Sequence, residues 1–86
     1  MTVIFVNEDN HGLLTVAKDY KAAIKFLIDN GWIKETTEVW ENEQFISLSE
    51  LLGYKAFDIM TENWDIDTFN DFWMNDFLLE EMEVYE

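Results

Sequence analysis

The fold is decided near the start of the chain, where residues 2–30 read TVIFVNEDNHGLLTVAKDYKAAIKFLIDN. Two short runs in this stretch, TVIFV and GLLTVA, are apolar and rich in β-branched residues, which favour strands. The segment NEDNH between them is polar and typical of a turn. The pattern predicts an N-terminal β-hairpin.

The hydrophobic period changes directly after the second run. Asp19 stands where the N-cap of a helix belongs, and Gly31 supplies a C-terminal stop. Between them, apolar residues recur at helical spacing: Ala23, Ile24, Leu27 and Ile28. We therefore expect a helix from about Tyr20 to Asn30.

In the middle of the chain the sequence signals for secondary structure are weaker. Residues 36–47, TTEVWENEQFIS, indicate two short strands about a polar turn at residues 41–43. Ser47 and Glu50 have the spacing of a capping box, which opens a helical turn that ends before Gly53. A second helical stretch covers residues 54–63, with Tyr54, Phe57 and Ile59 available for burial.

The C-terminal part predicts one more helix and one more strand. Asp65 or Asp67 caps a third helix, and three aromatic residues fall on one side of it: Phe69, Phe72 and Trp73. The final residues, 78–86, read LLEEMEVYE and indicate a strand that returns to the sheet.

Together these elements predict one compact α+β domain over residues 1–86. It has an N-terminal β-hairpin, about three helices and a C-terminal strand in an antiparallel or mixed sheet. A chain of this length buries only about 60–65% of the surface that its unfolded form exposes. Aromatic residues, 16% of the sequence, must therefore supply much of the core.

The sequence holds no cysteine, so neither a disulfide framework nor a thiolate metal site can form. It also shows no basic leader and no apolar run of the length that spans a membrane. We expect a cytoplasmic protein that makes no contact with membranes.

The charge is large and unevenly placed. The net charge is -14, whereas a magnitude of about 2–8 suffices for solubility. Up to Lys34 the acidic and basic residues balance. From Glu35 onward the chain has fifteen acidic residues and one basic residue, Lys55. An anionic half of this kind repels nucleic acid and attracts basic proteins. The Lys18, Lys21 and Lys25 trio reads as a solvated helix face.

No catalytic or cofactor motif is recognisable. The chain has one histidine, His11, in a turn, and two serines whose positions are explained by helix starts, so a nucleophile and its base cannot be assembled. Phosphate-binding loops and dinucleotide fingerprints are absent. We expect a protein that is not an enzyme and carries no cofactor.

The turn segment has a superficial likeness to a calcium loop. Asn7, Asp9 and His11 alternate ahead of Gly12, but the twelfth position, where a bidentate Glu is needed, holds Lys18. We therefore assign no metal site there.

The acidic half is dense in both carboxylates and large aromatic rings. Phe57, Phe69, Phe72 and Trp73 have core spacing, whereas Trp40, Trp64, Phe77 and Tyr85 fit the periodicity less well. Exposed aromatic residues of the latter group would anchor an interface, while the charges set approach rate and specificity. The predicted partner-binding residues are Asp58, Glu62, Asp65, Asp67, Asp71, Glu80, Glu81 and Glu83, with Trp64 and Tyr85 as anchors.

In size, acidity, lack of cysteine and lack of a catalytic signature, the whole chain resembles the small inhibitors encoded by phages and mobile elements, notably anti-CRISPR proteins. The resemblance extends to nuclease inhibitors of the barstar and colicin-immunity kinds and rests on no aligned motif. It implies a DNA mimic that acts in the cytosol of a bacterial host.

The first hypothesis is therefore a non-enzymatic acidic protein that binds and inhibits a basic nuclease or other nucleic-acid-binding protein. An alternative is a structural, assembly or small phage accessory protein that self-associates through aromatic surface, its acidity serving only to prevent aggregation. A third hypothesis is weak buffering of divalent cations.

Overall fold

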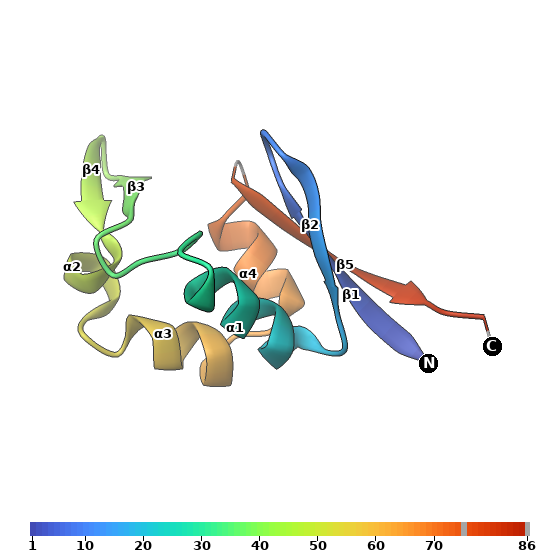
Figure 1. The fold of residues 1–86 in the computed structure, drawn as a ribbon. Helices are drawn as coiled ribbons and strands as arrows, with labels where there is room; N and C mark the ends of the chain where they lie inside the picture. Colours follow the sequence, from blue (N-terminus) through green and yellow to red (C-terminus); the bar gives the residue numbers. More distant parts are fainter. Residues whose placement is uncertain (75, 86) are drawn as a thin grey trace.

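A computed structural model describes residues 1–74 and 76–85, and it confirms an α+β domain. Its elements are β1 (Thr2–Glu8), β2 (Gly12–Ala17), α1 (Tyr20–Asp29), β3 (Glu38–Glu41), β4 (Gln44–Ser47), α2 (Leu48–Leu52), α3 (Ala56–Asp58), the π-helical turn η1 (Ile59–Asn63), α4 (Ile66–Phe72) and β5 (Phe77–Glu83). Helices pack against one face of a twisted sheet, and β3 and β4 form a separate lobe (Figure 1).

The main sheet has the order β2-β1-β5, and both pairings are antiparallel. The hairpin and the returning C-terminal strand are thus confirmed. Because side chains alternate along a strand, Ile4 and Val6 of β1 point to the same face as Leu79 of β5, and all three are buried. This inner face forms one wall of the core.

The opposite wall of the core comes from the helices. Ile24 and Leu27 of α1 and Phe69 of α4 are fully buried, and Trp73 just after α4 is 2% exposed. Phe57 and Phe72 are half-buried against this cluster. Tyr54 is 82% exposed, so its expected burial was wrong, because it lies in the turn before α3 and not in a helix that faces the core.

The helix starts follow the expected caps. The Asp19 carboxylate accepts a hydrogen bond from the Ala22 N–H at 2.8 Å at the start of α1, and Asp65 accepts from the Thr68 N–H at 2.8 Å at the start of α4. Both acids therefore have a structural role at a helix N-terminus.

Helix α4 is also tied to the edge of the sheet. The Asn70 side-chain amide donates to the Leu79 carbonyl oxygen, and its oxygen accepts from the Leu79 N–H, both at 2.8 Å. Unpaired backbone groups of an edge strand are a template for aggregation. Asn70 pairs with both backbone groups of Leu79 and so fixes the position of α4 along β5.

The β3–β4 hairpin turns through Asn42 and Glu43, with φ of 50° and 66°. A two-residue turn with positive φ at both positions matches the twist of a hairpin, and asparagine or glycine is preferred there. Glutamate has a Cβ that is strained in this conformation. The hairpin therefore stores strain at Glu43.

We expect Glu43→Gly to stabilise the hairpin by about 1 kcal/mol, because the left-handed conformation costs a residue with a Cβ roughly that amount. The amides of β3 and β4 should exchange about fivefold more slowly with solvent, as measured by hydrogen exchange. Asn42→Gly serves as the matched control and should change exchange less, because asparagine tolerates positive φ. Equal effects of the two substitutions would contradict the assignment of strain to Glu43.

The molecule is elongated, with principal extents of 45 × 25 × 22 Å. The paired ends of β1 and β5 project beyond the helices and carry both termini (Figure 1). Within the described residues, every helix is too short or too polar to cross a membrane.

Candidate functional site

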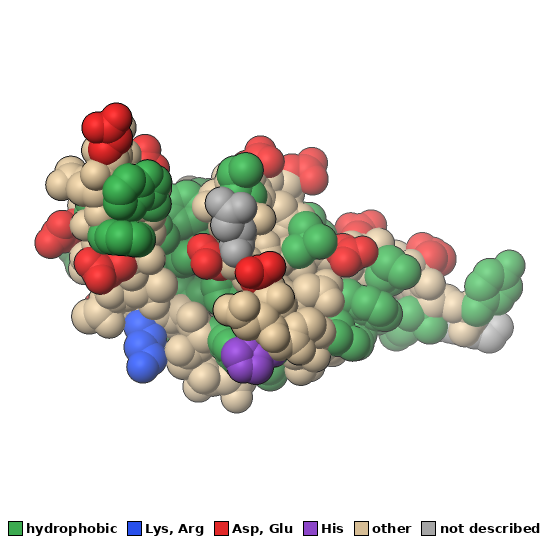
Figure 2. Space-filling view, turned by 90° about the horizontal axis from the view of Figure 1, so that it is seen from above, with side chains coloured by type: hydrophobic (Ala, Val, Ile, Leu, Met, Phe, Trp, Pro, Cys, Tyr) green, Lys and Arg blue, Asp and Glu red, His purple; other side chains and the backbone are tan. Residues whose placement is uncertain are grey.

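A groove lies between the β3–β4 hairpin and helix α4, and its volume is about 720 Å³. The residues that line it combine aromatic rings, carboxylates and a methionine: Glu38, Val39, Trp40, Glu41, Phe45, Trp64, Thr68, Asp71, Phe72, Met74 and Asp76. We refer to it as the acid–aromatic groove. Figure 2 shows the hollow beside the hairpin, with hydrophobic side chains inside it and acidic groups around it.

The apolar lining of the groove consists of two ring pairs. Trp40 and Phe45 are cross-strand partners whose ring centroids lie 4.9 Å apart in an edge-to-face arrangement. They are 62% and 65% exposed. On the other side, the centroids of Trp64 and Phe72 also lie 4.9 Å apart. Large exposed rings of this kind are unusual on a soluble monomer and typical of interface anchors.

The rings are accompanied by the carboxylates of Glu38, Glu41, Asp71 and Asp76, and no lysine lines the groove. Over residues 1–74 and 76–85, the carboxylates that form ion pairs are those of Glu8, Asp29 and Glu83. None of these belongs to the groove. Its negative charge is therefore available to a ligand.

Negative charges crowd one end of the groove. Partial burial raises the pKa of the Asp76 carboxyl, and the nearby charges of Asp9 and Glu8 raise it further. The pKa of Glu8, by contrast, is lowered, first by the hydrogen bond with His11 and then by the Asn10 N–H. The ionised form of Asp76 is thus less favoured in the folded protein than in the unfolded chain.

We therefore expect Asp76→Asn to raise the thermal midpoint at neutral pH. A carboxyl whose pKa is higher in the folded than in the unfolded state makes stability fall as the pH rises from the unfolded value through the folded one. The gain from Asp76→Asn should vanish below pH 3.8, the ordinary pKa of aspartate, where both states are protonated. Asp58→Asn removes the same charge on α3, and calorimetry should show a smaller gain for this control.

A second hollow of about 620 Å³ adjoins the groove, because Trp64 lines both. It contains three of the predicted partner-binding acids, Asp65, Asp67 and Glu81. The hydrogen bond from Thr68 lowers the pKa of Asp65, so this carboxyl is held ionised. Tyr20, also in this hollow, has a raised pKa because of burial and of the Asp65 charge, and its hydroxyl donates to the Met60 carbonyl oxygen.

The structure thus brings together Trp64, Asp65, Asp67, Asp71 and Glu81 around two adjoining hollows. It places the other predicted residues elsewhere. Asp58 and Glu62 lie on α3 and η1 and line neither hollow. Glu80 points to the opposite face of β5 from Glu81, and Glu83 and the fully exposed Tyr85 lie at the projecting tip.

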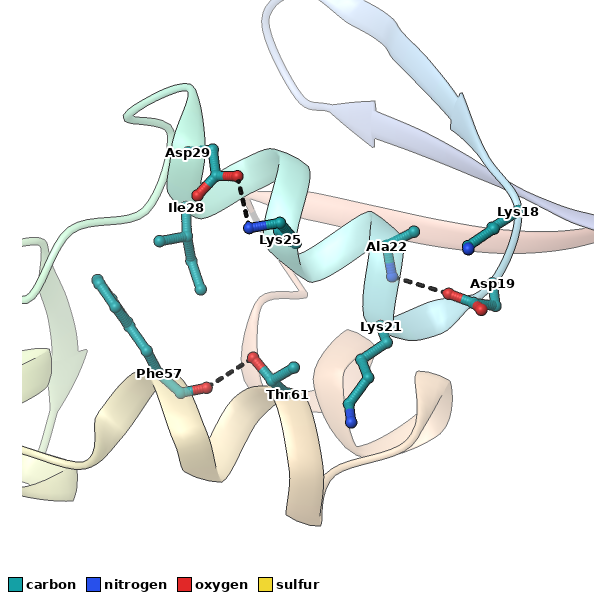
Figure 3. A pocket seen from close by; sticks show the side chains of 9 residues that line it. All are labelled: Lys18, Asp19, Lys21, Ala22, Lys25, Ile28, Asp29, Phe57 and Thr61. Atoms are coloured by element: carbon teal, nitrogen blue, oxygen red, sulfur yellow. Dashed lines mark hydrogen bonds and ion pairs between the residues drawn. The ribbon is translucent and has the colours of Figure 1, made fainter.

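Three of the five lysines lie together elsewhere on the surface. Lys18, Lys21 and Lys25 border a hollow of about 500 Å³ between α1 and the α3–η1 segment, over Ile28 and Phe57 (Figure 3). Lys25 Nζ lies 3.1 Å from the Asp29 carboxylate. These cations neither line nor neutralise the acid–aromatic groove.

His11 lies in the β1–β2 turn, as expected, with Nδ1 at 2.6 Å from Glu8 Oε1 and its ring edge-to-face with Trp32. Among the residues that the structure describes, no group of three or more His, Cys, Asp or Glu side chains could hold a metal ion.

Sequence reasoning missed several members of the groove, notably Phe45, Met74 and the hairpin acids Glu38 and Glu41. The pairing of Phe45 with Trp40 could not be predicted from a turn at residues 41–43, because it depends on the two-residue turn at Asn42 and Glu43 that the structure shows. Of the two aromatic residues proposed as anchors, Tyr85 is exposed and Trp64 is half-buried. Of the other two that fit the periodicity less well, Trp40 is exposed and Phe77 belongs to the core.

No family model, curated protein or solved structure matches this chain.

Proposed function

We propose that this protein is a non-enzymatic binder of a basic protein and that the acid–aromatic groove is its contact surface. The observation that carries the proposal is the combination of exposed aromatic rings with four carboxylates in one groove that no lysine lines.

The groove suits the side chains of lysine and arginine. A cation that lies over the face of Trp or Phe gains about 0.5–1 kcal/mol at an exposed site, and more when water is excluded. A carboxylate beside the ring adds a charge-assisted hydrogen bond. Trp40 and Phe45 with Glu38 and Glu41 offer both contacts on one hairpin, and Asp71 with Phe72 offers them on the facing helix.

The class of partner follows from the charge of the whole chain. At -14, the protein attracts cationic surfaces over the distance that screening permits, roughly 8 Å at physiological ionic strength. A large cationic cleft is the electrostatic footprint of a protein that holds the nucleic-acid backbone. We therefore propose that the partner is a nuclease or another nucleic-acid-binding protein and that binding blocks its nucleic-acid site.

The proposal is tested by capture of bacterial proteins on the immobilised chain, followed by elution with duplex DNA and, separately, with salt. The expected partner is basic, is eluted by both, and loses its affinity for DNA when this protein is added. Its capture should be lost with Trp40→Ala/Phe45→Ala and retained with Tyr54→Ala, which removes an exposed ring outside the groove. A captured protein that binds DNA and this chain at the same time would refute the inhibitory role.

A further inference from the structure

The main sheet has an open edge along the outer part of β5. In the order β2-β1-β5, this strand has a hydrogen-bonded neighbour strand on one side only. Its end projects beyond the helices together with β1, so no described helix covers the edge there (Figure 1). The backbone groups of an uncovered edge strand are free to pair with another strand.

The hydrogen bonds around β5 show which backbone groups face the open edge. In an antiparallel pair, residues that bond to the neighbouring strand alternate with residues whose N–H and C=O groups point away from it. Leu79 is of the second kind, since both of its groups bond to the Asn70 side chain. The pairing of β5 with β1 continues residue by residue to Glu83. By alternation, Glu81 and Glu83 also direct their N–H and C=O groups to the open edge.

Two further bonds agree with this assignment. The Val84 N–H donates to the Met1 carbonyl oxygen at 2.8 Å, so Val84, one residue after Glu83, faces β1. The Phe77 N–H donates to the Trp73 carbonyl oxygen at 3.0 Å, on the side away from β1. The start of the edge is thus closed by hydrogen-bond partners. In the part of the chain that the structure describes, the last two outward positions have no such partner for their backbone groups.

The surroundings of the open edge are acidic. Leu79 and Glu81 belong to this edge and also line the second hollow, which adjoins the acid–aromatic groove. The carboxylates of Asp65 and Asp67 and the ring of Trp64 lie in the same hollow, and its described lining includes no lysine. Figure 2 shows acidic side chains along the projecting arm and no lysine on that part of the face. A strand that pairs with this edge therefore meets carboxylates.

We infer that the open edge of β5 binds an extended basic segment, which adds a fourth strand to the main sheet beside Glu81 and Glu83. Backbone pairing supplies hydrogen bonds that are independent of sequence, and the hollow supplies specificity. The residue opposite Glu81 directs its side chain to the same face as Glu81, so a lysine or arginine there reaches the carboxylates beside Trp64. This inference rests on the proposed function, because the segment belongs to the basic partner.

Charge distinguishes between the occupants of such an edge. Like charges on neighbouring strands destabilise their pairing, and opposite charges stabilise it. A second copy of β5 would bring acidic residues together, and the net charge of -14 adds to the repulsion. The other edge strand, β2, contains no charged residue, so a basic segment gains no ion pair within it. The N-terminal ammonium lies 3.6 Å from Glu83, which leaves Glu81 and the acids of the hollow for the incoming cation.

The test uses a short peptide of alternating lysine and valine as the probe, and it follows hydrogen exchange at single amides of the isotope-labelled protein by NMR. With saturating peptide, the amides of Glu81 and Glu83 should exchange at least about tenfold more slowly, because their N–H groups gain acceptors. The Leu79 amide, already bonded to Asn70, should not change. A peptide of alternating glutamate and valine is the control and should protect none of these amides.

Glu81→Pro and Glu81→Gln form a matched pair of variants. Both remove the carboxylate, but only proline removes the N–H that faces the open edge, where an edge strand tolerates it. The basic peptide should bind Glu81→Pro about tenfold more weakly than Glu81→Gln. The amides that pair β5 with β1, followed in the same spectra, check that the sheet is retained.

The inference is overturned if the basic peptide leaves the exchange of the Glu81 and Glu83 amides unchanged. Protection of these amides by the acidic peptide, or equal affinities of the two variants, would also overturn it and would leave the carboxylates as mere protection against aggregation. The two proposals fail separately. Trp40→Ala/Phe45→Ala should keep the protection of the edge, whereas a peptide that shifts only the amides around these two rings would support the groove and exclude the edge.

Discussion

Trp73→Ala should destabilise the protein by about 3–5 kcal/mol, the usual cost of truncating a buried tryptophan. Trp73 is 2% exposed, and its ring centroid lies 5.0 Å from that of Phe72 and 5.5 Å from that of Phe77. It therefore joins the end of α4 to the start of β5. Small domains have a total stability of only about 5–15 kcal/mol, so this loss removes a large fraction of it.

The measurement is urea unfolding followed by far-ultraviolet circular dichroism, with the thermal midpoint as a second readout. The midpoint should fall by at least about 12 °C, at roughly 4 °C for each kcal/mol. Trp73→Phe is the informative control, because the Nε1–H of Trp73 finds no acceptor among the described residues. Phenylalanine keeps an aromatic ring and removes this unpaired donor, so it should cost far less. Similar losses for the two variants would contradict the described packing.

Asp67→Lys/Asp71→Lys should weaken binding of a basic partner at least about tenfold for each reversed charge, that is, by about 1.4 kcal/mol each. The two acids lie four residues apart on α4, so they share one side of the helix. Asp71 lines the acid–aromatic groove, and Asp67 lines the adjoining hollow. The substitutions therefore place cations where the partner's cations are proposed to bind.

Binding can be followed through tryptophan emission, because Trp40 is 62% exposed beside the groove. An arginine-rich peptide serves as the probe, with the captured partner as the second ligand. The affinity of the wild type should fall as salt rises, and the variant should show a flatter dependence. Circular dichroism checks that α4 is retained, since Asp67 lies in its first turn.

Asp58→Lys/Glu62→Lys is the matched control, because it tests whether the position of the reversed charges matters. It changes the net charge by the same amount, but on α3 and η1, outside both hollows. If the groove is the contact surface, this variant should lose much less affinity than the α4 variant. Equal losses would show that net charge alone governs binding and would remove the groove from the proposal.

Local sequence signals determined most of the secondary structure of this protein. The Asp19 and Asp65 caps, the change from strand to helical period after Ala17, and the strand character of residues 78–83 each depend on neighbours within a few positions. Such signals act on the backbone directly, through hydrogen bonds at helix ends and side-chain alternation along strands. For the same reason, the α+β class and the returning strand could be predicted without coordinates.

The places of the carboxylates could be predicted only in part. Asp67 and Asp71 both lie on α4, where a helical repeat of 3.6 residues puts them on one side, but Asp71 lines the groove and Asp67 the adjoining hollow. The eight predicted acids do not form one surface, however, because Glu80 and Glu81 necessarily point to opposite faces of β5. The number of acidic residues along a stretch of sequence does not show which side of each helix or strand is turned to solvent.

The sequence by itself determined the elements, their caps, the acidity and the scarcity of cations in the C-terminal half. Only the tertiary structure decided that the β3–β4 hairpin stands opposite α4 to form a groove, and that the described helices pack on one face of the main sheet. Both features arise from packing between elements that are far apart in the chain. Local propensity acts over a few residues, whereas the placement of whole elements is set by how the buried faces of the core fit together.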